Sequence, residues 1–219
     1  MMEHLLYEIR ENLERSRYMI AIVDYDAGNL KSVEKALIYI GEKPLVTDDS
    51  EVILSADKII LPGVGAFGEA MEKLKARGLV DTLRKAVEKG IPLLGICLGM
   101  QLLFDGSDES EGVEGLSILP GKITRIPANG VDKIPHMGWN SLEFPKQSKL
   151  FAGINEGAFV YFVHSYYLQA DNEEDVAATT EYITHIHAAV ESGNVYGCQF
   201  HPEKSGEVGL SILKNFVSL

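Results

Sequence analysis

Residues 91–104 read IPLLGICLGMQLLF, an apolar segment that changes from strand to helix character at a single cysteine. The run at 91–96 is typical of a strand buried on both faces of a parallel sheet. Residues 98–104 favour a helix that begins directly after it. Cys97 therefore lies at the tip of a tight strand-to-helix turn between Gly95 and Gly99. This arrangement is a nucleophile elbow with cysteine at its tip.

The alternation of strand and helix continues on both sides of this segment. Apolar strands are predicted at 19–23 and 58–61, and helices at 30–40, 69–76 and 79–89. This order predicts an α/β fold, with a mainly parallel central sheet and helices on both faces. The second half contains short alternating runs at 123–126, 140–144, 159–163, 186–190 and 195–200. These runs predict antiparallel additions to the same sheet, and a helix at 208–217 closes the chain.

The first 18 residues differ from the rest of the chain. Leu6, Ile9 and Leu13 fall on one helical stripe surrounded by charged residues. We therefore expect an amphipathic helical extension at 1–18 and one domain at 19–219.

Composition limits the classes of partner. The 219 residues carry 20 Lys+Arg against 32 Asp+Glu, a net charge of −12, which disfavours binding to nucleic acid or to anionic membranes. The longest uncharged stretch, 90–104, is shorter than the roughly 20 apolar residues of a membrane helix. Charged residues interrupt any signal-peptide core near the N-terminus, and two cysteines are too few for a disulfide framework. We expect a cytoplasmic protein.

Whether Cys97 is a nucleophile or a small core residue depends on a partner base. A helix N-terminus favours the thiolate form of a cysteine. His201 and Glu203 lie in the segment QFHPE at 199–203, where an extended backbone before proline puts both side chains on one side. Cysteine, histidine and an orienting acid make a catalytic triad. The order Cys, His, Glu disfavours an α/β-hydrolase such as a lipase or dienelactone hydrolase.

An oxyanion intermediate also needs hydrogen-bond donors. The segment PGVG at 62–65 follows a predicted strand, and its N–H groups could form an oxyanion hole with that of Leu98. Alone, such a segment is only a turn. No phosphate-binding loop occurs, and His185 and His187 lack a third metal ligand at suitable spacing. We expect no cofactor and no metal, and we expect Cys198 to be a small core residue.

Together, the segments at 62–65, 95–101 and 199–203 resemble the class I (triad) glutamine amidotransferases. Two further segments, DYDAGNL at 24–30 and PHMGWN at 135–140, resemble the glutaminase subunits of imidazole glycerol phosphate synthases, from histidine biosynthesis. The resemblance runs from about Met19 to the C-terminus. Asp26 departs from it, since the family often has glycine there.

The resemblance implies a mechanism. The Cys97 thiolate attacks the side-chain amide of glutamine, ammonia leaves, and water hydrolyses the resulting thioester to glutamate. His201 moves the protons and Glu203 orients it. The remaining implied site residues are the oxyanion-hole residues Gly63, Val64 and Leu98 and the glutamine-binding residues Gln101, Glu109, Ser165 and Tyr166. His164 is expected to be structural, and His136 has no evident chemical partner in the sequence.

The resemblance also implies a partner. Ammonia would pass to a cyclase subunit, expected to be a TIM barrel, that makes imidazole glycerol phosphate and AICAR from PRFAR; Trp139 is expected to face it. One alternative is a glutaminase for another synthase, such as anthranilate or aminodeoxychorismate synthase, which the segment at 135–140 disfavours. Another is a catalytically silent binding subunit, which would not need an intact Cys97, His201 and Glu203.

Overall fold

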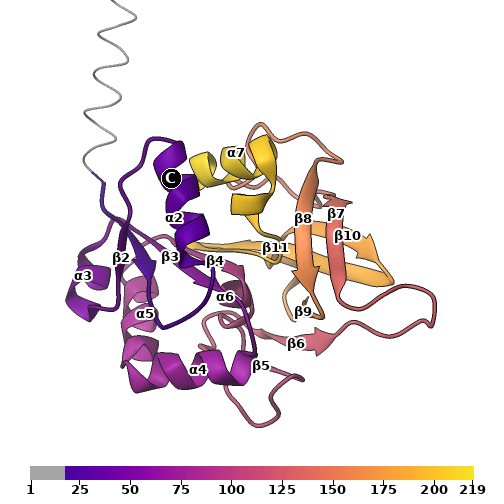
Figure 1. Cartoon of the computed structure of the whole chain (residues 1–219), viewed down its shortest axis with the longest axis horizontal. Coiled ribbons are helices and arrows are strands. Elements are labelled where there is room, and N and C mark those ends of the chain that lie inside the picture. The colour runs from indigo at the N-terminus through magenta and orange to yellow at the C-terminus, as the bar shows by residue number, and fades with distance from the viewer. Residues whose placement is uncertain (1–17) are drawn as a thin grey trace, which may run out of the picture.

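The structure is a computed structural model that describes residues 18–219, so most of the expected N-terminal extension lies outside the described residues. Helices cover both faces of a central sheet (Figure 1). The strands are β1 (Ile20–Val23), β2 (Leu45–Thr47), β3 (Lys58–Gly63), β4 (Leu93–Cys97), β5 (Gly106–Ser107), β6 (Gly121–Arg125), β7 (His136–Ser141), β8 (Phe159–His164), β9 (Tyr166–Ala170), β10 (Val176–Tyr182), β11 (Thr184–Ser192) and β12 (Val195–Cys198). The helices are α2 (Leu30–Tyr39), α3 (Ser50–Ser55), α4 (Phe67–Ala76), α5 (Leu79–Glu88), α6 (Leu98–Gln101) and α7 (Gly206–Val217), with short 3₁₀ helices η1 (Glu173–Asp175) and η2 (Pro202–Lys204).

The larger sheet confirms the expected α/β fold. Within residues 18–219 it has ten strands, in the order β2-β1-β3-β4-β12-β11-β9-β6-β5, with β10 paired to β11. The first five strands in this order are parallel to one another, namely β2, β1, β3, β4 and β12. Antiparallel pairs begin at β11 and continue through β9 to β6. The carboxyl end of β4 therefore lies inside the parallel part of the sheet, between β3 and β12.

Two expectations about the later strands were wrong. The run at 195–200 was expected to be an antiparallel addition, but β12 pairs parallel with β4 and antiparallel only with β11. The runs at 140–144 and 159–163 were expected in the same sheet, but β7 and β8 form a separate two-stranded sheet. Met137 and Trp139 of β7 are exposed, so this small sheet buries only one face.

Local patterns explain two further differences. The sequence pattern did not indicate β2, because it is a three-residue edge strand with no buried residue. The expected helix at 98–104 ends as α6 at Gln101. Beyond it the backbone tightens, because the N–H of Leu103 bonds the carbonyl of Met100 and that of Phe104 bonds Gln101.

Side-chain alternation along the strands builds two cores. Ala21 and Val23 of β1 face a cluster that includes side chains of α4 and α5. Ile20 and Ile22 face the opposite cluster, which includes side chains of α2 and α7. None of the helices in residues 18–219 is long and apolar enough to cross a membrane.

Candidate active site

The turn at Cys97 has the strained geometry of a nucleophile elbow. Cys97 has φ 54° and ψ −111°, a left-handed backbone that a non-glycine residue rarely adopts. A Cβ on Gly99 would lie 1.8 Å from the carbonyl oxygen of Leu61, and one on Gly95 would lie 2.7 Å from Met100 Cα. Because only glycine fits at both positions, α6 packs directly on the backbone of β3 and β4 and presents Cys97 at the end of the sheet.

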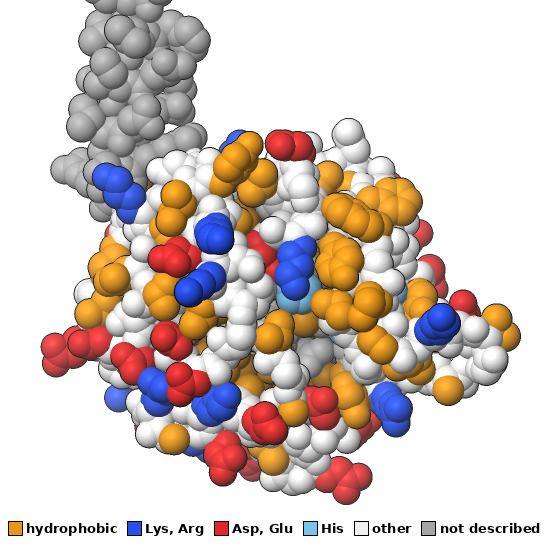
Figure 2. Space-filling model, in the orientation of Figure 1, with side chains coloured by type: hydrophobic (Ala, Val, Ile, Leu, Met, Phe, Trp, Pro, Cys, Tyr) orange, Lys and Arg blue, Asp and Glu red, His pale blue; other side chains and the backbone are white. Residues whose placement is uncertain are grey.

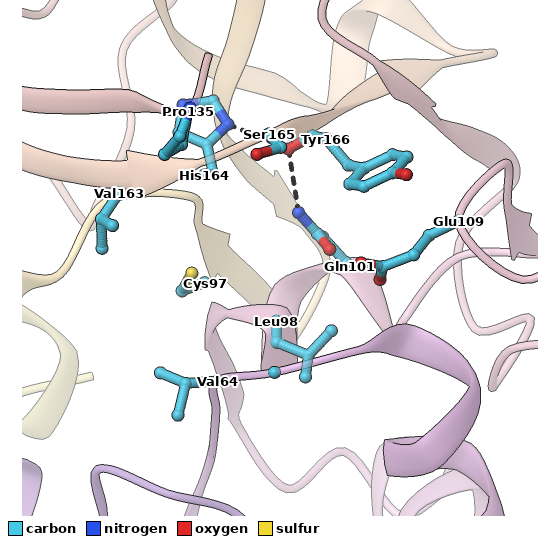
Figure 3. Close-up of a pocket in the computed structure, with 11 residues that line it drawn as sticks. Val64, Cys97, Leu98, Gln101, Glu109, Pro135, Val163, His164, Ser165 and Tyr166 are labelled. Atoms are coloured by element: carbon cyan, nitrogen blue, oxygen red, sulfur yellow. Dashed lines mark hydrogen bonds between the residues drawn. The ribbon is translucent and has the colours of Figure 1, made fainter.

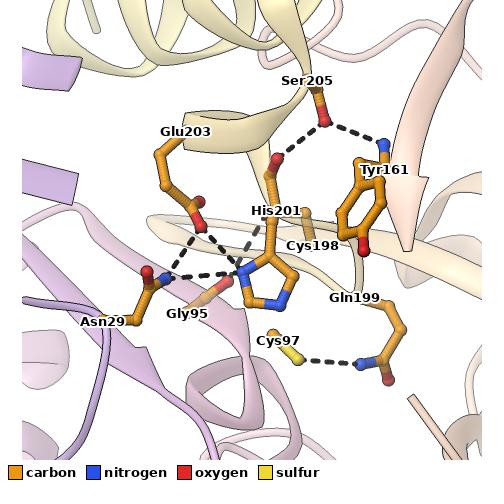
Figure 4. Close-up of polar contacts among 9 residues, drawn as sticks. All are labelled: Asn29, Gly95, Cys97, Tyr161, Cys198, Gln199, His201, Glu203 and Ser205. Carbon is orange, nitrogen blue, oxygen red and sulfur yellow. Dashed lines mark hydrogen bonds and ion pairs between the residues drawn. The ribbon is translucent and has the colours of Figure 1, made fainter. Parts of the chain in front are cut away.

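The structure brings His201 and Glu203 next to Cys97. His201 Nδ1 lies 2.8 Å from Glu203 Oε1, and neither side chain is exposed to solvent. The other ring nitrogen of His201 faces Cys97 (Figure 4). Burial lowers the pKa of His201, but its interactions with Cys97 and Glu203 outweigh burial and raise the pKa to about 9. The imidazole is therefore protonated at neutral pH, with its charge between the sulfur and the carboxylate.

Asn29 adds a fourth member that the sequence reasoning did not single out. Its Nδ2 donates to Glu203 Oε1 at 2.8 Å and lies 3.5 Å from His201 Nδ1 (Figure 4). Asn29 precedes α2 with φ 79°, and its side chain makes no capping bond to that helix. The side chain is thus directed to the Glu203 carboxylate instead. Two signals in the sequence pointed to Asn29: its place in the loop after β1, where the carboxyl ends of parallel strands gather, and its place in the segment 24–30 that carries the family resemblance.

Gln199 was also missed. Its Nε2 donates to Cys97 Sγ at 3.6 Å, and its Oε1 accepts from Gln101 Nε2 at 2.9 Å. The residue is fully buried. Its position two residues before His201 was the available signal, because positions i and i+2 of an extended segment lie on one side.

A pocket of about 390 Å³ opens beside Cys97 (Figure 3). Its lining contains Cys97 and six of the other expected site residues, namely Val64, Leu98, Gln101, Glu109, Ser165 and Tyr166, together with Gly65, Pro135, Val163 and His164. The expected oxyanion residue Gly63 is outside this lining, but it is the register partner of Cys97 across β3 and β4. Residues from both halves of the sequence therefore meet around the sulfur.

Two of the expected glutamine-binding residues also brace the pocket. Glu109 Oε2 accepts from the N–H of Phe67, the first residue of α4. Gln101 Nε2 donates to the carbonyl oxygen of Tyr166 at 3.0 Å. The acidic loop around Glu109 is therefore docked on a helix N-terminus, where a negative charge is favoured.

Tyr25 supports the segment expected to form the oxyanion hole. Its hydroxyl donates to the Pro62 carbonyl at 2.9 Å, and burial raises its pKa above the usual value. A Cβ on Gly63 would lie 2.4 Å from this hydroxyl oxygen. The next glycine, Gly65, has φ 108°, which allows a backbone turn that other residues disfavour.

The expectation that His136 has no chemical partner was wrong. Its Nδ1 lies 3.0 Å from Nε2 of His164, because the two residues are directly opposite across β7 and β8. A cross-strand register of this kind cannot be read from the sequence spacing.

The other candidate residues have structural surroundings. Cys198 is buried, and burial raises its pKa well above the usual value. His185 pairs with Glu181, and His187 Nδ1 accepts from the N–H of Ala170. Among residues 18–219, no group of three or more His, Cys, Asp or Glu side chains could hold a metal ion.

Comparisons with known proteins agree with this geometry. Residues 21–219 match the family "Glutamine amidotransferase class-I". Two relatives are the imidazole glycerol phosphate synthase subunits HisH of Moorella thermoacetica and Bacillus cereus. Each is 53% identical to this chain. The first alignment covers 91% of this chain and 94% of the Moorella protein, and the second covers 90% of this chain and 93% of the Bacillus protein.

Solved structures show the same fold. A structure described as a glutamine amidotransferase has a TM-score of 0.70 at 21% identity, covering 91% of this chain and 99% of that one. The structure of PurLQS from Thermotoga maritima has a TM-score of 0.70 at 23% identity, covering 92% of this chain and 98% of that one.

Proposed function

Because the chain belongs to the class I glutamine amidotransferase family, we propose that it hydrolyses glutamine to glutamate and ammonia at Cys97. We further propose that the ammonia serves a cyclase subunit of imidazole glycerol phosphate synthase, which makes imidazole glycerol phosphate and AICAR from PRFAR in histidine biosynthesis. The observation that carries the proposal is the buried Cys97–His201–Glu203 cluster at the base of a pocket, in a chain half identical to HisH subunits. We assign it to the cytoplasm.

The triad geometry supports acyl transfer through a thioester. His201 is protonated at neutral pH, as its raised pKa indicates, and can give this proton to the leaving ammonia after Cys97 attacks the amide carbon. The resulting neutral imidazole then takes a proton from the water that hydrolyses the thioester. Glu203 fixes which ring nitrogen carries the other proton, because its Oε1 bonds Nδ1.

Backbone N–H groups would stabilise the tetrahedral oxyanion. The N–H groups of the first helical turn have no partner within a helix, so that of Leu98 is available beside Cys97. The segment Gly63–Gly65 flanks the same position, and Val64 and Gly65 line the pocket. Two glycines around Val64 permit its peptide to turn its N–H toward or away from the oxyanion.

The end of the pocket away from Cys97 suits the α-amino and α-carboxylate groups of glutamine. We assign Gln101, Glu109 and the backbone of Ser165 and Tyr166 to glutamine binding, since all of them line the pocket. The Glu109 side chain is the one carboxylate in this lining and offers an acceptor for the substrate ammonium group.

The outer face of the small sheet suits a protein partner. Met137, Trp139 and Phe159 are 62%, 55% and 56% exposed, and the register of β7 against β8 puts all three on the same face, where exposed apolar side chains mark an interaction site. Hydrophobic side chains gather over β7 and β8 in the right half of Figure 2. We assign this surface to the cyclase contact, which would put the partner near the pocket where ammonia forms.

Cys97→Ala tests the proposal in a complex reconstituted with the cyclase. The variant should abolish glutamine-dependent synthesis and leave synthesis from added ammonium salts intact, because only the ammonia source is removed. The matched control is Cys198→Ala, which changes the other buried cysteine and should retain both activities. Loss of both activities in Cys97→Ala would mean that Cys97 is structural, and the proposal would be wrong.

A further inference from the structure

Two buried histidines connect the small sheet to the pocket wall. His136 on β7 and His164 on β8 are 3% and 6% exposed, and a 3.0 Å hydrogen bond joins His136 Nδ1 to His164 Nε2. His164 Nδ1 in turn lies 2.9 Å from the carbonyl oxygen of Tyr166. At the other end, Asn140 Nδ2 lies 3.4 Å from His136 Nε2. The four groups form one continuous chain of hydrogen bonds.

Only one arrangement of protons fits this chain. The Tyr166 carbonyl can only accept, so His164 Nδ1 must carry a proton. Burial lowers the pKa of His164 to about 3 and that of His136 to about 4, so both rings are neutral. His164 Nε2 therefore accepts from the Nδ1–H of His136, and His136 Nε2 accepts from the amide of Asn140. His136 thus determines which nitrogen of His164 is the donor.

The Tyr166 carbonyl is held from a second side by the catalytic centre. Gln101 Nε2 donates to the same oxygen at 3.0 Å and to Gln199 Oε1 at 2.9 Å, and Gln199 Nε2 donates to Cys97 Sγ. Figure 3 shows His164 and Gln101 approaching this carbonyl from different directions. Because Tyr166 also lines the pocket, the two donors together set the position of the pocket wall relative to the sulfur.

We propose that His136 and His164 are positioning residues for glutamine hydrolysis, which hold the Ser165–Tyr166 wall in the geometry that binds glutamine. This inference rests on the proposed function. The competing explanation is packing, because the His136 ring stacks between Phe162 and Tyr182, with centroid distances of 4.7 and 4.0 Å.

Two substitutions at His136 separate positioning from packing. His136→Phe keeps an aromatic ring between Phe162 and Tyr182 but removes the donor to His164. His136→Asn removes the stack, but its amide nitrogen can take the place of Nδ1 as donor. If His136 positions the pocket wall, His136→Phe should weaken glutamine binding more than His136→Asn. If His136 serves only packing, His136→Asn should weaken it more.

The first measurement is glutamine hydrolysis by the cyclase complex. The second is the rate at which iodoacetamide alkylates Cys97, because this reaction does not need the Ser165–Tyr166 wall. His136→Phe should raise KM about 10-fold, in line with leaving one buried acceptor unpaired. It should change kcat and the alkylation rate by less than about threefold. His136→Asn should restore KM to within about threefold of the wild-type value. His185→Phe, at an exposed histidine, is the control and should change nothing.

The outcomes are distinct. An inactive wild-type complex would refute the proposed function, whereas an active wild type with an unchanged KM in His136→Phe, or a larger KM increase in His136→Asn, would overturn the inference. If His136→Phe does not fold, imidazole ¹⁵N spectra of the wild-type complex decide. Neutral rings protonated at Nδ1 support the inference, and any other protonation state of His136 or His164 overturns it.

Discussion

Replacing Asn29 by glycine should weaken catalysis without touching the three triad side chains. Asn29 has φ 79°, so glycine can adopt the same backbone whereas alanine would add strain. The change removes the 2.8 Å hydrogen bond from Asn29 Nδ2 to the buried Glu203 carboxylate. Among the described residues, Glu203 Oε2 has no hydrogen-bond partner that could compensate.

The expected loss follows from the charge of the acceptor. A hydrogen bond to a charged group contributes about 1.5–3 kcal/mol. If the transition state, in which Glu203 must hold the imidazolium of His201, loses this amount, kcat/KM falls about 10- to 150-fold. The effect should lie in kcat, because Asn29 does not line the pocket.

Acid sensitivity gives a second readout of the same bond. Burial raises the pKa of Glu203, but the bonds from His201 and Asn29 outweigh it and lower the pKa below the usual value. A lowered carboxyl pKa stabilises the fold above the unfolded-state pKa, and this stability is lost as pH falls through the folded-state pKa. Without Asn29 the folded-state pKa rises, so acid unfolding of Asn29→Gly should begin at a higher pH.

Glutamate production by the cyclase complex is the assay, with urea unfolding between pH 3 and 7 run in parallel. Glu203→Gln serves as the reference for complete loss of the carboxylate charge. If Asn29→Gly retained kcat within twofold of the wild-type value while remaining folded, the assignment of Asn29 to the catalytic network would be refuted.

Three further predictions concern the N-terminus, pH and the partner. A chain that starts at Met19 should fold and hydrolyse glutamine, because β1 begins at Ile20 and the N–H of Met19 already bonds Asp57; a fall in melting temperature of more than about 10 °C would contradict this. kcat/KM should fall as pH rises through about 9, where His201 loses its proton. The stability that the raised pKa of His201 gives the fold should be lost between the pKa of histidine in the unfolded chain and pH 9. A profile of kcat/KM that stays flat to pH 10.5 would contradict this. The isolated chain should hydrolyse glutamine slowly, and a cyclase carrying its ligand should accelerate it about 10²- to 10³-fold by favouring the Val64 peptide orientation that completes the oxyanion hole; equal kcat/KM with and without partner and ligand would exclude this switch.

The sequence predicted the parts of the site that depend on local pattern. The apolar run before Cys97 and its two glycines indicated the elbow, and the extended segment at 201–203 indicated the pairing of His201 with Glu203. Both predictions use residues that are two to four positions apart in the chain, and such short spacings can be read from a single sequence.

The parts it did not predict depend on contacts between distant strands. Asn29 and Gln199 join the network only because β1, β4 and β12 end at the same edge of the sheet. The contact between His136 and His164 depends on the register of β7 against β8. Alternation of apolar and polar residues predicted strands at 140–144 and 159–163, but it does not indicate which strands pair. These two strands were therefore assigned to the wrong sheet.

The large sequence separation of the contacts around the triad makes enzymatic activity a late event in folding. Asn29 and Glu203 are 174 residues apart, and Gln199 and Cys97 are 102 apart. Closing such long loops costs chain entropy that is recovered only when the intervening strands have paired, so sheets dominated by distant contacts form slowly. A partly refolded chain can therefore hold most of its helices and still lack a nucleophile with a base. On dilution from denaturant, glutaminase activity should return after the far-ultraviolet circular dichroism signal, and a chain still under synthesis should not hydrolyse glutamine before His201 and Glu203 have emerged.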